Sequence, residues 1–186
     1  MPFHPTGIKD LTLFEPKIFE DERGFFMESY NKRLFAEEGN ILADFVQDNR
    51  SLSHKGVIRG LHLQIGEFAQ AKLVTVLKGA VIDIAVDLRK DSDTFGKSYA
   101  VELNTTNKWQ LFVPRGFGHG FIVLEDHTEF FYKCDNFYSK ENERGVYFFD
   151  ETLNIDCPIP ENERLLSPKD KALPPLAEIL QDLYFS

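Results

Sequence analysis

The chain has 186 residues, of which 42% are hydrophobic and eighteen are phenylalanine, so it has the length and composition of one folded domain with an aromatic core. This composition excludes an intrinsically disordered or fibrous protein. Thirty acidic against twenty-one basic residues give a formal charge of -9, which repels a polyanion over most of the surface and argues against nucleic acid as a partner.

The amino-terminal stretch MPFHPTGIKD lacks the basic start and the apolar run of a signal peptide, and no stretch of the sequence is apolar for long enough to span a bilayer. We therefore expect a cytoplasmic protein with no membrane partner. The first helix signal follows at Asn31, a favourable N-cap residue, and the helix is predicted to continue through Leu34 and Phe35 and to stop at Gly39.

The clearest strand signal lies between Lys72 and Leu88, in the sequence KLVTVLKGAVIDIAVDL. Apolar residues alternate with other residues along its second half, which is the period of a β-strand. Lys78 and Gly79 interrupt the run where a tight turn is expected. The segment is therefore predicted to form a hairpin with one face on a core.

Further strands are predicted at 99–103, 109–113, 121–124 and 129–133, separated by Gly, Asn, Asp and Pro. Many short, closely spaced strands favour a β-sandwich or barrel. The chain is predicted to end in an amphipathic helix over 174–186, after Pro174 and Pro175. Cys134 and Cys157 lie far apart and form no CxxC pattern, so we expect two reduced, structural thiols.

Two segments place a histidine beside glycine within strand-rich sequence: GLHLQ, which contains His62, and PRGFGH, which ends at His119. They resemble the two halves of a cupin barrel. In metal-binding cupins the first half supplies a second histidine and a glutamate, but Gln64 and Lys72 occupy those positions here. A protonated lysine cannot ligate a divalent cation. The departure predicts a pocket for acid-base chemistry with no metal and no cofactor.

Around this skeleton, a series of motifs resembles the dTDP-4-dehydrorhamnose 3,5-epimerases in order and approximate spacing, from the amino terminus to about residue 174. The motifs are DERG at 21–24, QDN at 47–49, RGLH at 59–62, the segment 83–89, GHGF at 118–121, YK at 132–133 with Tyr138, and SPKD at 167–170. Each motif is weak evidence by itself, but the ordered set is strong.

The resemblance implies an all-β, cupin-type jelly-roll barrel with short peripheral helices, comprising the single domain 1–186. It also implies a substrate, a dTDP-linked 4-keto-6-deoxyhexose, whose C3 and C5 hydrogens are acidified by the C4 ketone. Epimerisation then needs a base, an acid on the opposite face and a donor to the developing oxyanion. This chemistry would convert dTDP-4-dehydro-6-deoxy-D-glucose to dTDP-4-dehydro-L-rhamnose, in dTDP-L-rhamnose biosynthesis.

The resemblance assigns a role to each catalytic candidate. His62 is the expected base, because an imidazole with an ordinary pKa of about 6.5 is largely neutral at pH 7. Asp170 is expected to orient it, with Asp83 as a second possibility. Tyr132 is the expected acid. Lys72 would point into the barrel and stabilise the oxyanion.

Each of these candidates also has an ordinary structural explanation. His62 by itself would more often be a buried histidine with backbone partners, and Lys72 a solvated lysine at the start of a strand. Tyrosines in β-proteins are commonly packing residues. Tyr138 competes with Tyr132 for the role of acid, although the resemblance assigns Tyr138 to packing against the nucleotide. The role of His119 stays open between binding sugar or phosphate and filling a structural position.

The resemblance also nominates residues that would bind the substrate, in addition to Lys72, His119 and Tyr138. They are Arg23, Phe26, Glu28, Gln47, Asn49, Arg59, Glu143 and Lys169. Arginine suits a diphosphate because its planar fork makes two parallel charge-assisted hydrogen bonds. In the family, the amino-terminal strand over about 19–30 reaches into a neighbouring subunit, which implies a homodimer.

Two alternatives remain at this stage. One is an epimerase that inverts only C3 or only C5 of a related sugar, which the motifs cannot distinguish. The other is a non-catalytic cupin that binds a sugar nucleotide. Such a protein has no need for His62, Tyr132 and Asp170 together, so their joint presence favours the enzyme.

Overall fold

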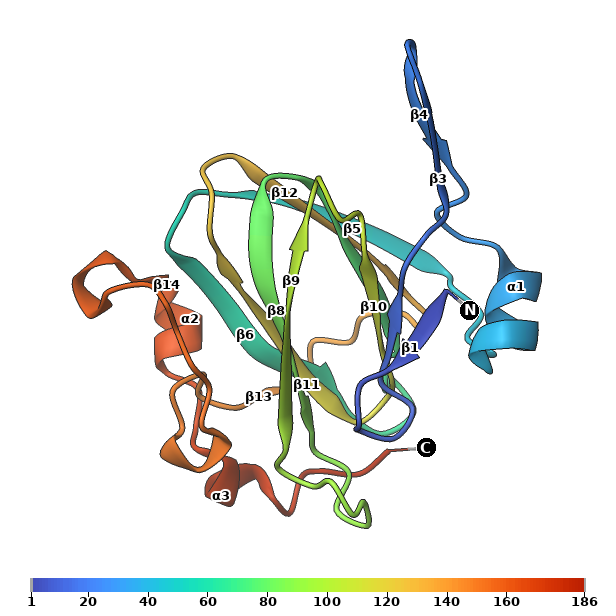
Figure 1. Ribbon diagram of the computed structural model, residues 1–186. Helices are drawn as coiled ribbons and strands as arrows, with labels where there is room; N and C mark the ends of the chain where they lie inside the picture. The colour runs from blue at the N-terminus through green and yellow to red at the C-terminus, as the bar shows by residue number, and fades with distance from the viewer. Residues whose placement is uncertain (1, 186) are drawn as a thin grey trace.

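Two β-sheets form the body of the molecule in the computed structural model, which describes residues 2–185 (Figure 1). The first sheet has the strand order β1-β2-β10-β7-β12-β5. Its strands are β1 (Phe3–Pro5), β2 (Thr12–Phe14), β10 (Gln110–Val113), β7 (Lys72–Lys78), β12 (Thr128–Cys134) and β5 (Gln47–Ser53). All neighbouring strands in this sheet are antiparallel.

The second sheet has the order β13-β6-β11-β8-β9, with the short strand β14 parallel to β6. Its strands are β13 (Glu143–Gly145), β6 (Val57–Gln64), β11 (Phe117–Val123), β8 (Ala80–Asp87), β9 (Ser98–Asn104) and β14 (Leu165–Leu166). Apolar side chains from both sheets meet in one cluster, which includes Val74, Phe130, Val81 and Phe121. The predicted all-β barrel is therefore confirmed.

The strands predicted between Lys72 and Leu88 are present, but the predicted hairpin is wrong. β7 pairs with β10 and β12 in the first sheet, whereas β8 pairs with β11 and β9 in the second. Gly79 lies at the crossing with a φ of +79°, and a Cβ there would lie 2.3 Å from Thr128 Oγ1. The chain therefore needs glycine at this point to pass from one sheet to the other.

Helix α1 (Lys32–Gly39) covers one end of the outer face of the first sheet, with Phe35 packed against Phe14 and Leu73. It forms as predicted, because the Asn31 side chain accepts hydrogen bonds from the first turn of the helix. The outer face of the second sheet is covered by the carboxy-terminal part of the chain, through residues such as Phe148 and Leu176. This part includes η1 (Glu151–Leu153), η2 (Glu161–Glu163), α2 (Pro168–Lys171) and α3 (Leu176–Ile179).

The predicted helix over 174–186 is wrong, because only α3 is helical and the chain then turns and extends. Leu183 packs into the hydrophobic core, and the backbone carbonyl of Tyr184 accepts a hydrogen bond from Gly66 N. These two contacts hold the tail in a non-helical conformation. Residue 186 lies outside the described residues. Among residues 2–185, no helix has the length and apolar character that crossing a membrane requires.

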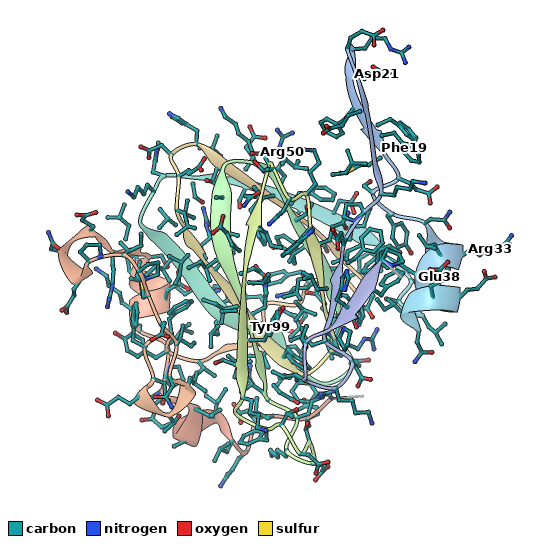
Figure 2. All side chains as sticks on the ribbon, in the orientation of Figure 1. Phe19, Asp21, Arg33, Glu38, Arg50 and Tyr99 are labelled. Atoms are coloured by element: carbon teal, nitrogen blue, oxygen red, sulfur yellow. The ribbon has the colours of Figure 1, made fainter. Side chains whose placement is uncertain are left out.

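The strand predicted over about 19–30 is a hairpin made of β3 (Ile18–Asp21) and β4 (Gly24–Met27). These strands pair only with each other within the described chain, and they project as an arm away from the barrel (Figure 1). Figure 2 shows Phe19 and Asp21 along this arm, remote from the labelled barrel residue Tyr99. Phe25 and Phe26 are 56% and 69% exposed, so the arm leaves large apolar side chains without cover.

Candidate active site

A cavity of about 680 Å³ opens into the barrel and collects polar side chains from both sheets. The residues predicted for the site that line it are Asn49, Arg59, His62, Lys72, His119, Tyr132, Lys169 and Asp170. A second cavity of about 300 Å³ shares four of these residues and adds Gln47, Tyr138 and Glu143. Most of the predicted site residues therefore gather in one region.

His62 lies on β6 with its Nε2 atom 2.7 Å from Asp170 Oδ1. The histidine side chain is 29% exposed in the cavity, whereas the aspartate side chain is 6% exposed. Gly60 makes this part of β6 possible, because its φ is +107° and a Cβ there would lie 2.6 Å from the carbonyl oxygen of His119. The contact between His62 and Asp170 agrees with the predicted pairing of an imidazole with an orienting carboxylate.

Asp170 is held by the first turn of α2. Ser167 caps that helix: its hydroxyl accepts from Asp170 N at 3.0 Å and donates to Asp170 Oδ2 at 2.6 Å. Burial by itself would raise the pKa of the Asp170 carboxyl, but the contact with His62 and the Ser167 hydroxyl outweigh it and lower that pKa. The carboxylate is therefore ionised at neutral pH and fixed in place beside His62.

His119 has a separate carboxylate partner, since its Nε2 lies 2.9 Å from Asp83 Oδ1. Both side chains are buried, His119 at 6% exposure and Asp83 at 0%. The alternative in which Asp83 orients His62 is therefore wrong, because β8 carries Asp83 to the neighbouring histidine on β11.

Lys72 begins β7 and points into both cavities. Its Nζ lies 6.0 Å from the centre of the Tyr132 ring. Burial lowers the pKa of Lys72 below its ordinary value, and nearby acidic groups, Asp83 among them, oppose the shift without cancelling it. An amine in this position can donate a hydrogen bond to a substrate oxygen in either protonation state.

Tyr132 lies on β12 directly across from Val74 of β7 and Asn49 of β5. Burial raises the pKa of the Tyr132 phenol above its ordinary value, although the Arg59 guanidinium acts in the opposite direction. The phenol therefore carries its proton at neutral pH, as a general acid must.

Charged residues that were predicted to bind substrate are also paired at the mouth of the second cavity. Glu143 accepts from Lys169 Nζ at 2.6 Å and from the Tyr138 hydroxyl at 3.1 Å. Burial would raise the pKa of Glu143, but these contacts outweigh it and lower that pKa. On the other side of the site, Arg59 donates to the hydroxyl of Ser53.

Three predicted residues lie outside both cavities of the single chain. Both Arg23 and Phe26 are on the β3–β4 arm: Arg23 is in the turn, where it pairs with Asp21, and Phe26 is on β4 opposite Phe19. Glu28 follows the arm and accepts from the Asn31 side chain at 3.0 Å.

Gln64 stands at a position that ligates metal in other cupins, but its side chain makes a different contact here. The Gln64 carbonyl oxygen accepts a hydrogen bond from Ser139 N at 3.0 Å. Among residues 2–185, no group of three or more His, Cys, Asp or Glu side chains is arranged to hold a metal ion.

The match to known proteins covers nearly the whole chain. The family model described as dTDP-4-dehydrorhamnose 3,5-epimerase matches residues 5–178. The chain belongs to this family. A dTDP-4-dehydrorhamnose 3,5-epimerase of Shigella flexneri is 54% identical over 165 residues, which cover 89% of this chain and 90% of that protein. The protein is accordingly an isomerase.

A solved structure and a more distant relative extend the comparison of this epimerase. The dTDP-6-deoxy-D-glucose-3,5-epimerase of Legionella pneumophila Philadelphia 1, in complex with dTDP-4-keto-L-rhamnose, has 46% identity and a TM-score of 0.93, covering 98% of this chain and 96% of that one. This similarity bears out the cupin-type fold. A dTDP-4-dehydrorhamnose 3-epimerase of Streptomyces niveus is 35% identical over 96% of this chain and 85% of that protein.

The candidate site also contains residues for which the motifs gave no role. Ser167 holds Asp170, Ser53 holds Arg59, and the stacked rings of Phe121 and Phe130 line the larger cavity. Ser167 had a detectable signal, since a serine three residues before an acidic residue at a helix start is a capping pattern. The other two contacts each join residues of two successive strands, β5 with β6 and β11 with β12, and depend on how those strands pack, which no sequence motif specifies.

Proposed function

We propose that the protein converts dTDP-4-dehydro-6-deoxy-D-glucose to dTDP-4-dehydro-L-rhamnose by inverting both C3 and C5, as a step in dTDP-L-rhamnose biosynthesis. The observation that carries this proposal is the His62–Asp170 contact in a cavity shared with Lys72 and Tyr132. A base, an acid and an oxyanion donor are the three groups that proton transfer beside a ketone requires.

His62 is the proposed base. The C4 ketone acidifies the neighbouring C–H bonds, and the imidazole takes a proton from C5 or C3 while the electron pair moves onto the C4 oxygen to give an enolate. The anionic Asp170 stabilises the imidazolium that forms and fixes the ring orientation. His62 is exposed in the cavity while Asp170 is buried behind it, which is the arrangement this transfer needs.

Lys72 is the proposed donor to the enolate oxygen. A preorganised donor of this kind is typically worth about 3 to 4 kcal/mol in the barrier. Burial lowers the pKa of Lys72, so a charged ammonium is less stable in the empty cavity than in water. A developing oxyanion would favour the charged form, and the stabilisation would thus be larger in the transition state than in the ground state.

Tyr132 is the proposed acid that returns a proton to the opposite face. Its raised pKa keeps the phenol protonated before transfer and makes the phenolate a strong base that regains a proton afterwards. Loss of a proton to His62 and gain of one from Tyr132 on the other face together invert a centre. The same pair of groups acts at both centres if the sugar ring is repositioned between steps.

The remaining predicted residues are proposed to bind the nucleotide. Arg59 and Lys169 carry the positive charge that a diphosphate needs in an otherwise acidic protein. Tyr138 is 53% exposed at the mouth of the smaller cavity, so its ring is free to pack against the nucleotide. Gln47, Asn49 and Glu143 supply further hydrogen-bonding groups there.

We also propose that a homodimer completes each site with Arg23, Phe26 and Glu28 from the neighbouring subunit. The β3–β4 arm supports this, because it leaves Phe25 and Phe26 exposed, projects away from the barrel of its own chain and contributes no residue to either cavity. A second copy of the chain would cover these rings and bring Arg23 to a diphosphate.

The product formed from dTDP-4-keto-6-deoxyglucose in deuterated water tests the activity. Nuclear magnetic resonance should show inverted configuration and deuterium at both C3 and C5. Inversion at C3 alone would replace the proposal with the activity named for the Streptomyces niveus relative. An unchanged substrate without deuterium would contradict the proposal of an epimerase altogether.

A further inference from the structure

Gln64 is a buried polar residue whose side chain reaches from the barrel to a surface loop. It is the last residue of β6, two positions after His62, and it is 5% exposed. Its Oε1 atom accepts a hydrogen bond from the backbone N–H of Ser139 at 3.0 Å. A buried amide needs such a partner, so the bond is part of how the site is built.

Ser139 lies in the middle of the segment 135–142, which joins β12 to β13. The two ends of the segment have their own attachments. Gln70 Nε2 donates to the carbonyl of Asn136 at 2.7 Å, and Ile65 N donates to the carbonyl of Asn142 at 3.0 Å. Gln64 therefore attaches the centre of a segment whose ends are already fixed.

The segment carries Tyr138, the residue immediately before the attached amide. Tyr138 is 53% exposed and its neighbour Phe137 is 61% exposed, so burial does little to hold either ring. The Tyr138 hydroxyl donates to Glu143, which is the direct cross-strand partner of Gln64 in the β13–β6 pair. Two contacts hold Tyr138 in place: the bond to the amide of the next residue, Ser139, and the bond from its hydroxyl to Glu143. Gln64 makes the first contact and lies directly across from the residue that makes the second.

We propose that Gln64 is a positioning residue that holds the 135–142 segment so that Tyr138 is placed at the mouth of the site before substrate binds. The position that resembles a metal ligand in other cupins serves here as a loop anchor. The kinetic part of the proposal rests on the proposed function, through the binding role of Tyr138. The anchoring part does not, and the two are tested separately.

Limited trypsin digestion of the protein without substrate tests the anchoring. Lys140 is exposed and follows the attached amide, so cleavage after it reports opening of the segment. Gln64→Met keeps the side-chain length and removes the acceptor. Cleavage after Lys140, followed by mass spectrometry, should be roughly two- to tenfold faster, the factor that loss of one hydrogen bond gives. Gln64→Glu keeps an acceptor and should be cleaved more slowly than Gln64→Met.

Gln110→Met is the matched control for cleavage. Gln110 is also a buried strand glutamine, at 3% exposure, but its side chain donates to the carbonyl of Ser29, far from this segment in the sequence. It should leave cleavage after Lys140 unchanged. An unaltered cleavage rate in Gln64→Met, or an equal increase in Gln110→Met, overturns the proposal whatever the protein catalyses.

Steady-state kinetics test the connection to Tyr138. Gln64→Met should raise KM roughly two- to tenfold with a smaller change in kcat. In a Tyr138→Ala background the same substitution should change KM little, because the ring it positions is gone. A full-sized effect of Gln64→Met in that background overturns the proposal. Failure of the unaltered protein to epimerise the sugar would instead overturn the proposed function and leave the cleavage result standing.

Hydrogen exchange in the unaltered protein examines the same bond and needs no folded variant. The Ser139 amide should exchange more slowly than the neighbouring Lys140 amide, because it is bonded to Gln64. Exchange of the Ser139 amide at the rate of an unstructured peptide overturns the anchoring.

Discussion

His62 and His119 are direct partners across the β6–β11 pair, yet each imidazole contacts a different carboxylate. His62 lies 2.7 Å from Asp170 and His119 lies 2.9 Å from Asp83. The side chain of His62 is 29% exposed, whereas that of His119 is 6% exposed. Two similar dyads therefore differ in access to the cavity, and this difference favours His62 as the group that meets the substrate.

Asp170→Asn should lower kcat by about 10²-fold or more while KM changes little. The amide cannot stabilise the imidazolium that forms when His62 takes a proton, although it has nearly the same shape as the carboxylate. Initial rates with saturating sugar nucleotide provide the measurement. Ser167→Ala is the matched control: it removes both hydrogen bonds between the Ser167 hydroxyl and Asp170 but leaves the charge, so its effect should be about tenfold or less. A rate near that of the unaltered protein in Asp170→Asn would rule out this role.

The fold was predictable where the signal is local. Alternation identified the strands between Lys72 and Leu88, and a capping residue identified the helix after Asn31, because period and capping depend on neighbouring residues. Strand pairing depends on the whole chain. The sequence around Gly79 therefore predicted a hairpin turn, although β7 and β8 belong to different sheets.

The residues of the candidate site could be nominated only through resemblance. His62 and Asp170 are 108 positions apart in the sequence, and no periodicity connects a histidine in a strand to an aspartate in a short helix. The partner of Asp83 shows the limit of this reasoning, because the sequence suggested His62 as a possible partner, whereas the structure places Asp83 beside His119. The pairing of β8 with β11 determines the partner, because it places Asp83 beside the residues of β11.

A buried carboxylate outside the site should govern part of the acid stability. Asp87 accepts hydrogen bonds from Arg89, Ser92 and Thr94. Burial would raise its pKa, but these bonds outweigh it and lower the pKa from 3.8 to about 2. The resulting stability, about 2 kcal/mol, should be fully present above pH 4 and lost as the pH falls toward 2.

Denaturant unfolding of Asp87→Asn and of the unaltered protein measures this contribution. The difference in free energy of unfolding should be largest at neutral pH and should shrink as the pH falls from about 4 to 2. Thr94→Val removes one of the hydrogen-bond donors to Asp87 and should show the same pH trend with a smaller amplitude. This second variant provides the measurement if Asp87→Asn does not fold. A difference that stays constant over this range would show that the ionisation of Asp87 is not its source.

Activity should survive exhaustive chelation. Lys72 and Gln64 stand where two of the four metal ligands of other cupins would be, and the Gln64 carbonyl is bonded to Ser139 N. Two histidines are too few donors for tight binding of a divalent cation. Rates measured before and after dialysis against a chelator provide the test, together with metal analysis of the protein. Stoichiometric zinc, iron or manganese whose removal abolishes activity and whose return restores it would refute this prediction.

If the proposed homodimer shares its sites, two inactive variants should complement each other. One variant carries Arg23→Ala with Glu28→Ala, and the other carries His62→Asn. Unfolding and refolding them together at equal concentration should yield hybrid dimers with one intact site, and thus about a quarter of full activity. Size-exclusion chromatography with mass spectrometry must show that hybrids form. If hybrids are present and the mixture is no more active than its parents, each site is built from one chain.

Isotope exchange should separate the base from the acid. If His62 removes the C5 proton, enolate formation requires only His62, Asp170 and the Lys72 donor. Tyr132→Phe removes the hydroxyl that is proposed to return a proton to the other face, but it keeps a ring of nearly the same shape. Binding and enolate formation should therefore largely persist in this variant, whereas His62→Asn should stop the reaction at its first step.

In deuterated water the two variants should consequently give different products. Tyr132→Phe should introduce deuterium at C5 of the unchanged substrate, provided that His62 exchanges its proton before returning it, and should form little inverted product. His62→Asn should show neither exchange nor inversion. Nuclear magnetic resonance of the recovered sugar nucleotide distinguishes these results. Inversion at the normal rate by Tyr132→Phe would assign the acid to another group, with Tyr138 the next candidate, and exchange in His62→Asn would show that the base is a different residue.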